Sequence, residues 1–330
     1  MGNDDHAAIR RMADLATPMA LRVAVTLGLP DRLRGDGDAA DRLAAGLDVS
    51  PTALELLLNH LVTLGVVERT GAGYRTTSLG AHLCADAGNG LTHTLLHLDR
   101  AGGRAELAFV ELAHSVATGR AGYPRRYGRD FYDDLSAHPH LRESFDRQMT
   151  QRSRDQVPDL VAGFDWSRFA DVVDVGGGNG TLLAAVLAAH PAMTGHLVEL
   201  EAAAAESTFR AGGLAERARV TAGSFFDPLP AGAQAYVLCD VLHNWDDDGA
   251  RRVLGRCAEA AGPTSRVLVI EAVGGRRANT AMDLAMLVIF GGRERRVDEF
   301  RALAAGQGLV LEGVTDLTDE RCLLEFKPAG

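Results

Sequence analysis

The chain has 330 residues, with 34 basic and 44 acidic side chains and a formal net charge of −10 at pH 7. A nucleic-acid-binding protein needs a basic surface to replace the counterions on phosphate, so this balance argues against one. The four cysteines form no CxxC pair, the N-terminus has no apolar signal segment, and no apolar run reaches transmembrane length. We therefore expect a cytoplasmic protein that contacts no membrane and has neither a disulfide framework nor a zinc site.

Residues 1–100 read as a helical region with one β-hairpin. Residues 38–66 predict two helices, the second with Ser50 as its N-cap and Pro51 at its first position. Two β-prone runs then flank the Gly-Ala-Gly at residues 71–73, which indicates a hairpin. This order is that of a winged helix. The second helix has no Arg or Lys with which to contact DNA, so we expect it to be a core or dimer helix.

Residues 101–160 are expected to form connecting helices, and from residue 161 onward the pattern changes. Near-continuous apolar runs such as "DVVDVGGG", "AYVLCDVL" and "RVLVIEAV" then alternate with helical stretches. Apolar strands separated by helices predict a parallel sheet that is covered by helices on both faces. The sequence therefore predicts an α/β domain over residues 161–330.

The segment "VVDVGGGNGT" predicts a strand, a glycine turn and a helix. Gly176, Gly178 and Gly180 allow a tight turn and a close approach to a ligand. Thr181 stands where the dinucleotide fingerprint G-x-G-x-x-G has its third glycine, which counts against a nicotinamide dehydrogenase. The G-x-G-x-G spacing, with Asp174 just before it, is typical of nucleoside-binding methyltransferases. A tight turn that binds nothing is the plainer alternative.

Further candidates for a ligand site follow the next two predicted strands. Glu199 ends the first of them, where an acid can accept hydrogen bonds from both ribose hydroxyls. Ser224 and Phe225 come at the carboxyl end of the other, beside the crevice where open α/β sheets bind ligands. Phe225 would line an adenine ring and Ser224 would hydrogen-bond it. Alternatively, Phe225 or Phe226 belongs to the core.

The segment "YVLCDVLHNWDDDG" ends an apolar strand on a histidine, His243, which is followed by Asn244 and Trp245. A buried core histidine and a metal ligand are the alternatives to a catalytic role. The aspartates at residues 246–248 are the acids nearest in sequence, and they more simply cap the following helix and favour its N-terminal dipole. We therefore expect no metal dependence.

These motifs form an ordered series, which continues with "VIEAV" and "GGRERRVDEFRALAAGQGL". The series resembles the plant and bacterial small-molecule O-methyltransferases that use S-adenosylmethionine, and most of all the bacterial enzymes that modify aromatic polyketides and related antibiotics. The resemblance implies a winged-helix-like dimerisation domain over residues 1–100. Residues 101–160 would contribute to the substrate pocket, and residues 161–330 would form a Rossmann-like catalytic domain. It also implies a homodimer, S-adenosylhomocysteine as product and a small hydroxylated aromatic substrate.

The resemblance also implies which residues form the site. His243 matches the family's catalytic base, and Glu271 and Glu294 match two acids that flank it. The residues that would contact the cofactor are Gly176, Gly178, Glu199, Leu200, Ser224, Phe225, Cys239, Trp245 and Ser153. Those that would contact the substrate are Arg11, Met19, Phe145, Met149 and Asn244. We also expect Met282, Met286 and Phe290 to line an aromatic pocket, although their helical spacing would equally suit a core.

Three positions depart from the family pattern. Ser224 stands where many members have Asp, Asn244 stands where Asp often follows the histidine, and Cys239 replaces Lys or Ser. None of these changes removes the base. Asn244 changes the hydrogen bonding on the substrate side.

The expected mechanism is the deprotonation of a hydroxyl beside an already activated methyl group, so the enzyme mainly aligns the reacting atoms. A phenol has a pKa of about 10 and a histidine one of about 6.5. A neutral His243 within hydrogen-bond reach can take the proton at neutral pH and contribute about 10²- to 10⁴-fold. Glu271 or Glu294 would hold the other ring nitrogen and stabilise the imidazolium.

Two other functions stay open at this point. The same fold and cofactor could serve N-methylation, decarboxylation or hydroxylation, because a histidine base favours O-methylation without proving it. A winged-helix DNA-binding regulator is disfavoured by the helix that lacks cations.

Overall fold

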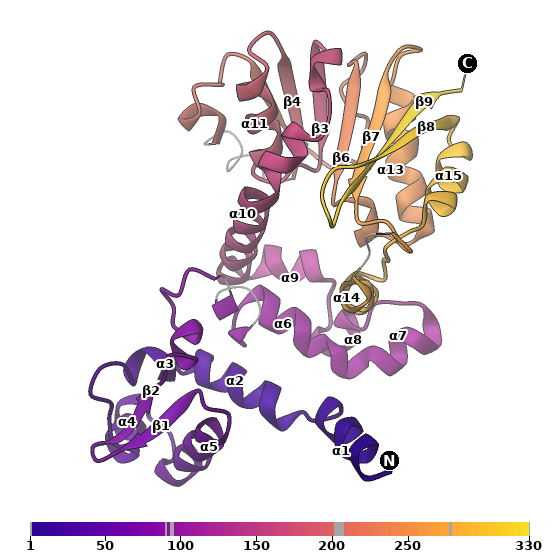
Figure 1. Cartoon of the computed structure of the whole chain (residues 1–330). Coiled ribbons are helices and arrows are strands. Elements are labelled where there is room, and N and C mark those ends of the chain that lie inside the picture. The colour runs from indigo at the N-terminus through magenta and orange to yellow at the C-terminus, as the bar shows by residue number, and fades with distance from the viewer. Residues whose placement is uncertain (1, 90, 93–95, 201–207, 277–278, 330) are drawn as a thin grey trace. The chain divides into compact units, whose positions relative to one another are not determined.

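The computed structural model describes residues 2–89, 91–92, 96–200, 208–276 and 279–329, without the side chains of residues 2, 3 and 153. The chain forms two compact units, which Figure 1 colours by position along the chain. The first unit comprises residues 1–107 and 135–148, and the second comprises residues 108–134 and 149–330. Helices α9 (Phe131–Ala137) and α10 (Pro139–Ala162) have residues in both. The division at residues 100 and 160 stays a prediction.

The first unit consists of helices around a small hairpin. Its helices are α1 (Gly2–Met12), α2 (Ala16–Thr26), α3 (Leu29–Arg32), α4 (Ala40–Leu47), α5 (Pro51–Thr63), η1 (Gly80–Leu83) and α6 (Ala101–Leu107). The hairpin pairs β1 (Val67–Thr70) with β2 (Gly73–Thr76) in antiparallel register, as the glycines between them predict.

The apolar face of α5 lies in the core of the first unit. Leu54, Leu58 and Leu61 are buried, and their spacing of three and four residues puts them on one side of the helix. The hydroxyl of Ser50 accepts a hydrogen bond from the amide of Ala53 at 3.4 Å, so the predicted N-cap is confirmed. The predicted core helix is therefore correct, whereas the winged-helix assignment stays a prediction.

The second unit is built on a sheet of seven strands, as far as the described residues show. The strands are β3 (Asp171–Val175), β4 (Thr194–Glu199), β5 (Ala218–Ala222), β6 (Ala235–Cys239), β7 (Arg266–Glu271), β8 (Leu309–Asp316) and β9 (Cys322–Pro328), in the spatial order β5-β4-β3-β6-β7-β9-β8. The helices are η3 (Ala108–Glu111), α7 (Leu112–Thr118), α8 (Tyr123–Tyr127), η4 (Trp166–Arg168), α11 (Thr181–Ala189), η5 (Leu242–Asn244), α13 (Asp247–Ala260), α14 (Thr280–Phe290) and α15 (Val297–Ala305).

The sheet is parallel from β5 to β7, but β9 runs antiparallel to both β7 and β8. The expectation of a wholly parallel sheet is therefore wrong for one strand, β9, whose two pairings are antiparallel. Residues 317–321 alone join β8 to β9. A parallel connection needs a crossover of a dozen residues or more, whereas antiparallel neighbours need only a short turn.

The strands bury alternate residues on two sides of the sheet. Val173 and Val175 pack with α13 and α15 on one face, while Val172 packs with α10 and α11 on the other. This alternation confirms the predicted α/β domain with helices on both faces. Because both faces are buried, the strands read as near-continuous apolar runs in the sequence.

Strand β3 is the point at which the strand order reverses, since it pairs with β4 on one side and β6 on the other (Figure 1). At such a point an open α/β sheet forms a crevice outside the carboxyl ends of its strands, where ligands bind. The glycine loop follows β3, and the turn with His243 follows β6. The fold thus brings both motifs to one edge of the sheet.

Candidate active site

The glycine loop is held against the acid that ends β4. Gly176, Gly178 and Gly180 have φ angles of +74°, +60° and +74°, which L side chains rarely adopt. The carboxylate of Glu199 accepts hydrogen bonds from the amide of Gly178 at 3.0 Å and from that of Leu200 at 2.8 Å. Each of its oxygens keeps a further lone pair for a ligand hydroxyl. Glu199 therefore lies where the sequence predicts, beside the loop.

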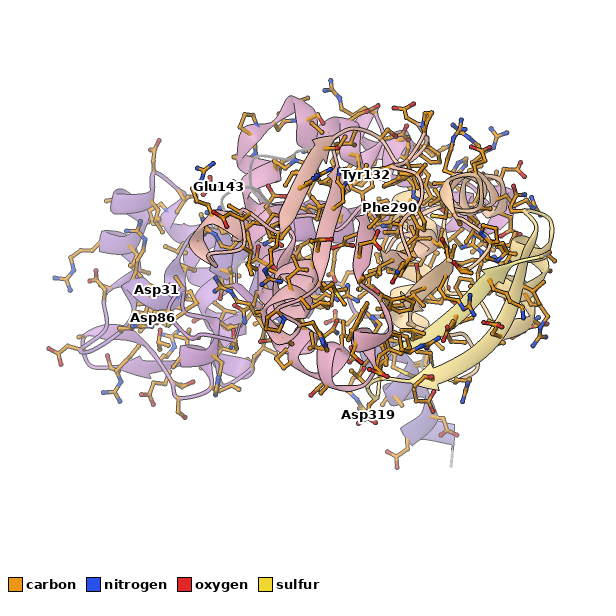
Figure 2. The ribbon with its side chains drawn as sticks, turned by 90° about the horizontal axis from the view of Figure 1, so that it is seen from above. Asp31, Asp86, Tyr132, Glu143, Phe290 and Asp319 are labelled. Carbon is orange, nitrogen blue, oxygen red and sulfur yellow. The ribbon has the colours of Figure 1, made fainter. Side chains whose placement is uncertain are left out.

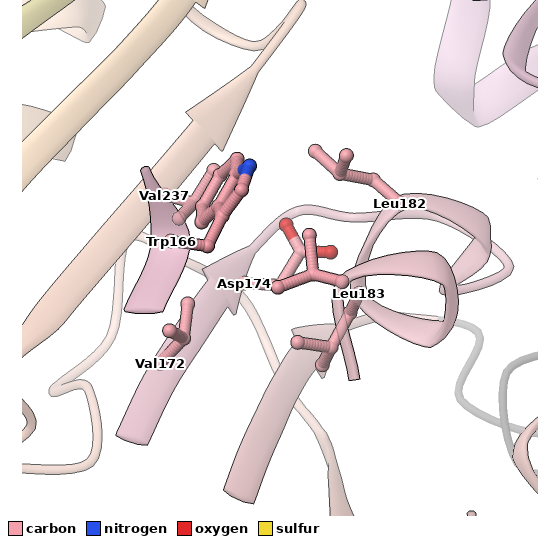
Figure 3. A pocket seen from close by; sticks show the side chains of 7 residues that line it. Trp166, Val172, Asp174, Leu182, Leu183 and Val237 are labelled. Atoms are coloured by element: carbon pink, nitrogen blue, oxygen red, sulfur yellow. The ribbon is translucent and has the colours of Figure 1, made fainter. Parts of the chain in front are cut away.

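A buried acid lies beneath the same loop (Figure 3). Asp174 is 2% exposed, and neither of its carboxyl oxygens has a hydrogen-bond partner among the described residues. A Cβ atom at Gly177 would collide with this carboxyl group, so only glycine fits there. Burial, with a smaller contribution from Glu199, raises the pKa of Asp174 to about 7.

Asp174 is missing from the ligand contacts that the sequence suggested. The signal was present, because an acid stands in the otherwise apolar strand "VVDV" directly before the loop. A buried polar group without a partner is costly. Such a group at a ligand crevice points to a donor that a ligand supplies.

Aromatic side chains close the other side of the loop. The ring of Phe225 lies 3.1 Å from the position that a Cβ at Gly176 would take. Trp245 meets Phe226 edge-on, with ring centroids 4.8 Å apart, and Phe225 at 5.9 Å. Both phenylalanines are half-buried and pack on the core, and the contact of Phe225 with an adenine ring stays a prediction. The hydroxyl of Ser224 accepts a hydrogen bond from the amide of Phe226 at 3.1 Å.

His243 lies in the single turn η5, and the side chain of Glu271 binds backbone amides of this turn. One carboxylate oxygen of Glu271, at the end of β7, accepts hydrogen bonds from the amides of Leu242 at 2.6 Å and His243 at 3.2 Å. The ring Nδ1 of His243 lies 3.2 Å from Glu294 and 3.8 Å from the second oxygen of Glu271. Glu294 is therefore the hydrogen-bond partner of the imidazole, and Glu271 mainly fixes the turn.

The two carboxylates change the protonation of the histidine. Burial alone lowers the pKa of His243, but the charge of Glu271 and the hydrogen bond that the ring donates to Glu294 outweigh it and raise the pKa to about 9. Burial also raises the pKa of Glu271 to about 7. The expectation of a neutral imidazole at neutral pH is therefore wrong for the protein by itself. Among the described residues, Nε2 of His243 has no hydrogen-bond partner.

The same three side chains have the spacing of a metal site. Ligand atoms of His243, Glu271 and Glu294 all lie within 4.8 Å of one another, and no other such group occurs in the described part of the chain. Hydrogen bonds within the protein use Nδ1 of His243 and Oε1 of each acid, while Oε2 of Glu271 and Oε2 of Glu294 have no hydrogen-bond partner among the described residues.

The aspartates after Trp245 hold protein groups. Asp246 accepts a hydrogen bond from the amide of Gly249 at 2.8 Å, which confirms the predicted helix cap. Asp248 pairs with Arg251 at 2.6 Å, and Asp247 pairs with arginines of the segment before α15.

Asn244 connects the histidine turn to an aromatic cluster that includes Tyr132 and Phe290, which are labelled in Figure 2. Its amide nitrogen donates to the hydroxyl of Tyr132 at 3.3 Å and to the carbonyl of Asp240 at 3.4 Å. Tyr132 stacks on Phe290, with ring centroids 5.5 Å apart. Sequence reasoning missed Tyr132, because nothing in its local pattern relates it to a turn 112 residues away. Phe290 thus belongs to an aromatic cluster beside the turn, and its place in the lining of a substrate pocket stays a prediction.

The structure gives the burial or the position of the remaining residues that were predicted to contact cofactor or substrate. Met286 is buried in α14, while Met282 and Cys239 are half-buried. Burial raises the pKa of the Cys239 thiol well above its usual range. Arg11, Met19 and Phe145 belong to the first unit, so their substrate contacts stay predictions. Met149 lies in α10, and the side chain of Ser153 lies outside the described residues.

Comparison with protein families decides what kind of protein this is. Residues 109–310 match the model of the O-methyltransferase domain. The chain belongs to the O-methyltransferase family. Residues 10–86 match the O-methyltransferase dimerisation domain. The resemblance inferred from the motifs is therefore confirmed. No described helix of this O-methyltransferase family member is long and apolar enough to cross a membrane.

Individual relatives cover nearly the whole chain. A 2,7-dihydroxy-5-methyl-1-naphthoate 7-O-methyltransferase of Streptomyces carzinostaticus is 47% identical over 93% of each chain. The aclacinomycin 10-hydroxylase of Streptomyces purpurascens is 40% identical over 96% of this chain and 89% of its own. A solved O-methyltransferase from neocarzinostatin biosynthesis, in complex with S-adenosylmethionine and 2-hydroxy-5-methyl naphthoic acid, has a TM-score of 0.91. It is 44% identical and covers 97% of this chain and 98% of its own.

Proposed function

We propose that this protein transfers a methyl group from S-adenosylmethionine to a hydroxyl of a small aromatic substrate in secondary-metabolite biosynthesis, with His243 as the general base. The observation that carries the proposal is the orientation of that imidazole at the ligand edge of the sheet. Its Nδ1 is held by Glu294, and its Nε2 has no partner among the described residues. The names of the naphthoate relatives support a bicyclic, hydroxylated aromatic acid as the substrate class.

The residues around the glycine loop fit the cofactor. S-adenosylmethionine, when bound, supplies a methyl group on a positively charged sulfur. Asp174 offers a buried carboxyl without a partner, which suits the ligand's amino group. Glu199 keeps lone pairs for the ribose hydroxyls, and Phe225 with Trp245 offers an apolar wall for the adenine.

His243 would take the proton of the substrate hydroxyl on Nε2. Glu294 would then accept the stronger hydrogen bond of the imidazolium, and the charge of Glu271 would stabilise the same cation. The raised pKa of His243 lies closer to the pKa of a phenol, about 10, so the transfer is less uphill than for an ordinary histidine. The consequence is that the basic form becomes abundant only at alkaline pH.

Location and assembly complete the proposal. The dimerisation domain supports a homodimer that forms through the first unit. The free thiols of Cys84, Cys239, Cys257 and Cys322 support a reducing, cytoplasmic location.

Hydroxylation is the second candidate activity, because one relative of high identity is named as a hydroxylase. Both candidates are tested together by incubating the protein with methyl-labelled S-adenosylmethionine and a panel of hydroxynaphthoic acids. Methylation adds one carbon and two hydrogens with the label, whereas hydroxylation adds one oxygen without it and needs dioxygen and a two-electron reductant such as a thiol in the assay, the second oxygen leaving as water. The His243→Ala variant should lose about 10²-fold or more in kcat while binding S-adenosylhomocysteine as the wild type does. Unchanged turnover in that variant would remove the base from the proposal.

A further inference from the structure

Arg295 reaches the histidine turn from the segment between α14 and α15 and is fully buried. Its Nη1 donates to the carbonyl of Leu242 at 2.8 Å, and its Nη2 donates to the carbonyl of Trp245 at 2.7 Å. Its Nε and Nη2 also contact one oxygen of Asp247 at 3.1 and 3.0 Å. The two carbonyls belong to the residues immediately before and two positions after His243, so the guanidinium spans the histidine.

These contacts supply hydrogen-bond donors to backbone carbonyls at a helix of a single turn. The carbonyl of Leu242 already accepts a hydrogen bond from the amide of Trp245 at 3.2 Å, and the carbonyl of Trp245 lies just beyond the end of η5. Arg295 adds a second donor to the first carbonyl and supplies a donor to the second, and buried backbone groups without a partner are costly. The guanidinium has five N–H donors in one rigid plane, which can serve two carbonyls and a carboxylate at once. A buried charge is tolerated when it is paired, as Arg295 is by Asp247 at 3.0 Å.

Gly292 and Glu294, from the same short segment, approach the turn as well. A Cβ atom at Gly292 would collide with the carbonyl oxygen of His243 and would lie 2.8 Å from the carbonyl carbon of Asn244. Glu294 holds the Nδ1 atom of the ring. Gly292, Glu294 and Arg295 therefore contact the imidazole, the carbonyl of the histidine and the carbonyls of Leu242 and Trp245.

We propose that Gly292 and Arg295 are positioning residues for His243, which fix the backbone of its turn so that the ring keeps Glu294 on Nδ1 and presents Nε2 to the substrate. This inference rests on the proposed function and adds the residues that act through the base without touching the reacting atoms. A displacement of about 1 Å at a catalytic group can cost 10²-fold in rate. A loosened turn should therefore reduce kcat while leaving the glycine loop and its cofactor contacts unchanged.

Arg293 provides a matched control in the same segment. It also pairs with Asp247, at 3.3 Å, but its other partner is Glu299 at 2.6 Å, and its side chain is 40% exposed. In the described part of the chain, Arg293 makes no hydrogen bond to a carbonyl of the turn, so Arg293→Gln removes an ion pair to Asp247 without releasing the histidine backbone.

The test compares Arg295→Lys, Gly292→Ala, Arg293→Gln and His243→Ala with the wild type, using the full chain and a hydroxynaphthoate acceptor. Arg295→Lys keeps the charge but cannot serve three acceptors from one plane. We expect it and Gly292→Ala to lower kcat by about 10- to 100-fold, with affinity for S-adenosylhomocysteine within about threefold of wild type. Arg293→Gln should stay within about twofold of the wild-type kcat.

The pH dependence of kcat separates positioning from general destabilisation. A ring that loses its hydrogen bond to Glu294 loses part of what raises its pKa. The alkaline rise in kcat should therefore move to lower pH in Arg295→Lys and Gly292→Ala, and should stay in place in Arg293→Gln. A protein that is merely less stable would keep the wild-type profile at lower amplitude.

Each outcome decides a different question. Wild-type kcat and profile in both Arg295→Lys and Gly292→Ala would overturn the inference, as would equal losses in Arg295→Lys and Arg293→Gln. Should Arg295→Lys fail to fold, Gly292→Ala alone decides by the same two readouts. Full turnover in His243→Ala would instead overturn the proposed base, and a wild type without methyl transfer would overturn the proposed function.

Discussion

Glu294 lies 3.2 Å from Nδ1 of His243, whereas Glu271, whose Oε2 lies 3.8 Å from the same atom, directs its other oxygen, Oε1, to the backbone amides of the histidine turn. The two acids therefore do different work. A proton on Nδ1 that points at Glu294 leaves the lone pair of the neutral ring on Nε2. The base is thus oriented by one carboxylate and anchored by the other.

These different roles predict that a variant of Glu294 loses turnover, whereas a variant of Glu271 loses stability. Glu294→Gln keeps the shape of the side chain but removes its charge, so kcat should fall while thermal stability changes little. Glu271→Ala leaves two buried amides without an acceptor, each costing about 1–3 kcal/mol of unfolding free energy. Chemical denaturation together with turnover assays would check both. Equal loss of stability in the two variants would contradict these different roles.

The pH dependence of turnover should follow His243. Its pKa is raised to about 9, and the neutral ring is the form that accepts a proton. The kcat/KM value should therefore increase as pH rises from 7 toward 9, because a growing fraction of His243 loses its proton and becomes the neutral, basic form. Initial rates across this range would measure it, with His243→Ala as the flat control. A profile that has already levelled off at pH 7 would show that the carboxylates do not hold the proton.

Asp174 should be a determinant of cofactor affinity. Asp174→Asn keeps the volume of the side chain but removes the negative charge, and hydrogen bonds to charged groups contribute about 1.5–3 kcal/mol. Binding of S-adenosylhomocysteine should weaken by roughly 10- to 100-fold. Calorimetry, or the shift in melting temperature on adding the ligand, would detect this loss.

Asp171→Asn is the matched control for that change, since Asp171 begins the same strand, β3, which Asp174 nearly ends. Its affinity for S-adenosylhomocysteine should equal that of the wild type. Equal affinity in Asp174→Asn as well would remove Asp174 from the cofactor site.

Tyr132 and Asn244 should act as one unit on the substrate side. Tyr132→Phe keeps the stacking on Phe290 but removes the hydroxyl that accepts from Asn244. Loss of one such hydrogen bond, about 1 kcal/mol, should raise KM for the aromatic acceptor by roughly fivefold. Asn244→Ala should have a similar effect, and the double variant should be no worse than either single one. Additive effects would show that the contact is incidental.

Chelation tests whether His243, Glu271 and Glu294 bind a metal ion. Nδ1 of His243 and one oxygen of each acid already take part in hydrogen bonds within the protein, so dialysis against EDTA should leave turnover unchanged. Activity that disappears on chelation and returns with Mg²⁺ or Mn²⁺ would assign the three side chains to a metal ion instead.

Local signals in the sequence were sufficient for the elements and for the family. Apolar runs predict the strands, glycines with positive φ mark the loop after β3, and Ser50 and Asp246 cap their helices as predicted. Each of these features depends on residues only a few positions apart, so periodicity and spacing reveal it. The motif series likewise identified the O-methyltransferase family and, with it, His243 as the candidate base.

Only the tertiary structure decided what surrounds that base. Glu294 is 51 residues from His243 in the chain, and Arg295 is 53 residues from the carbonyl of Leu242. No local pattern indicates which acid meets the ring and which meets the backbone, because sheet order and loop packing bring these groups together. The same contacts raise the pKa of His243, since an ionisation equilibrium follows nearby charges and burial and not residue type alone. The sequence by itself determined the elements, the family and the candidate base, and the folded chain decided the partners and protonation of that base.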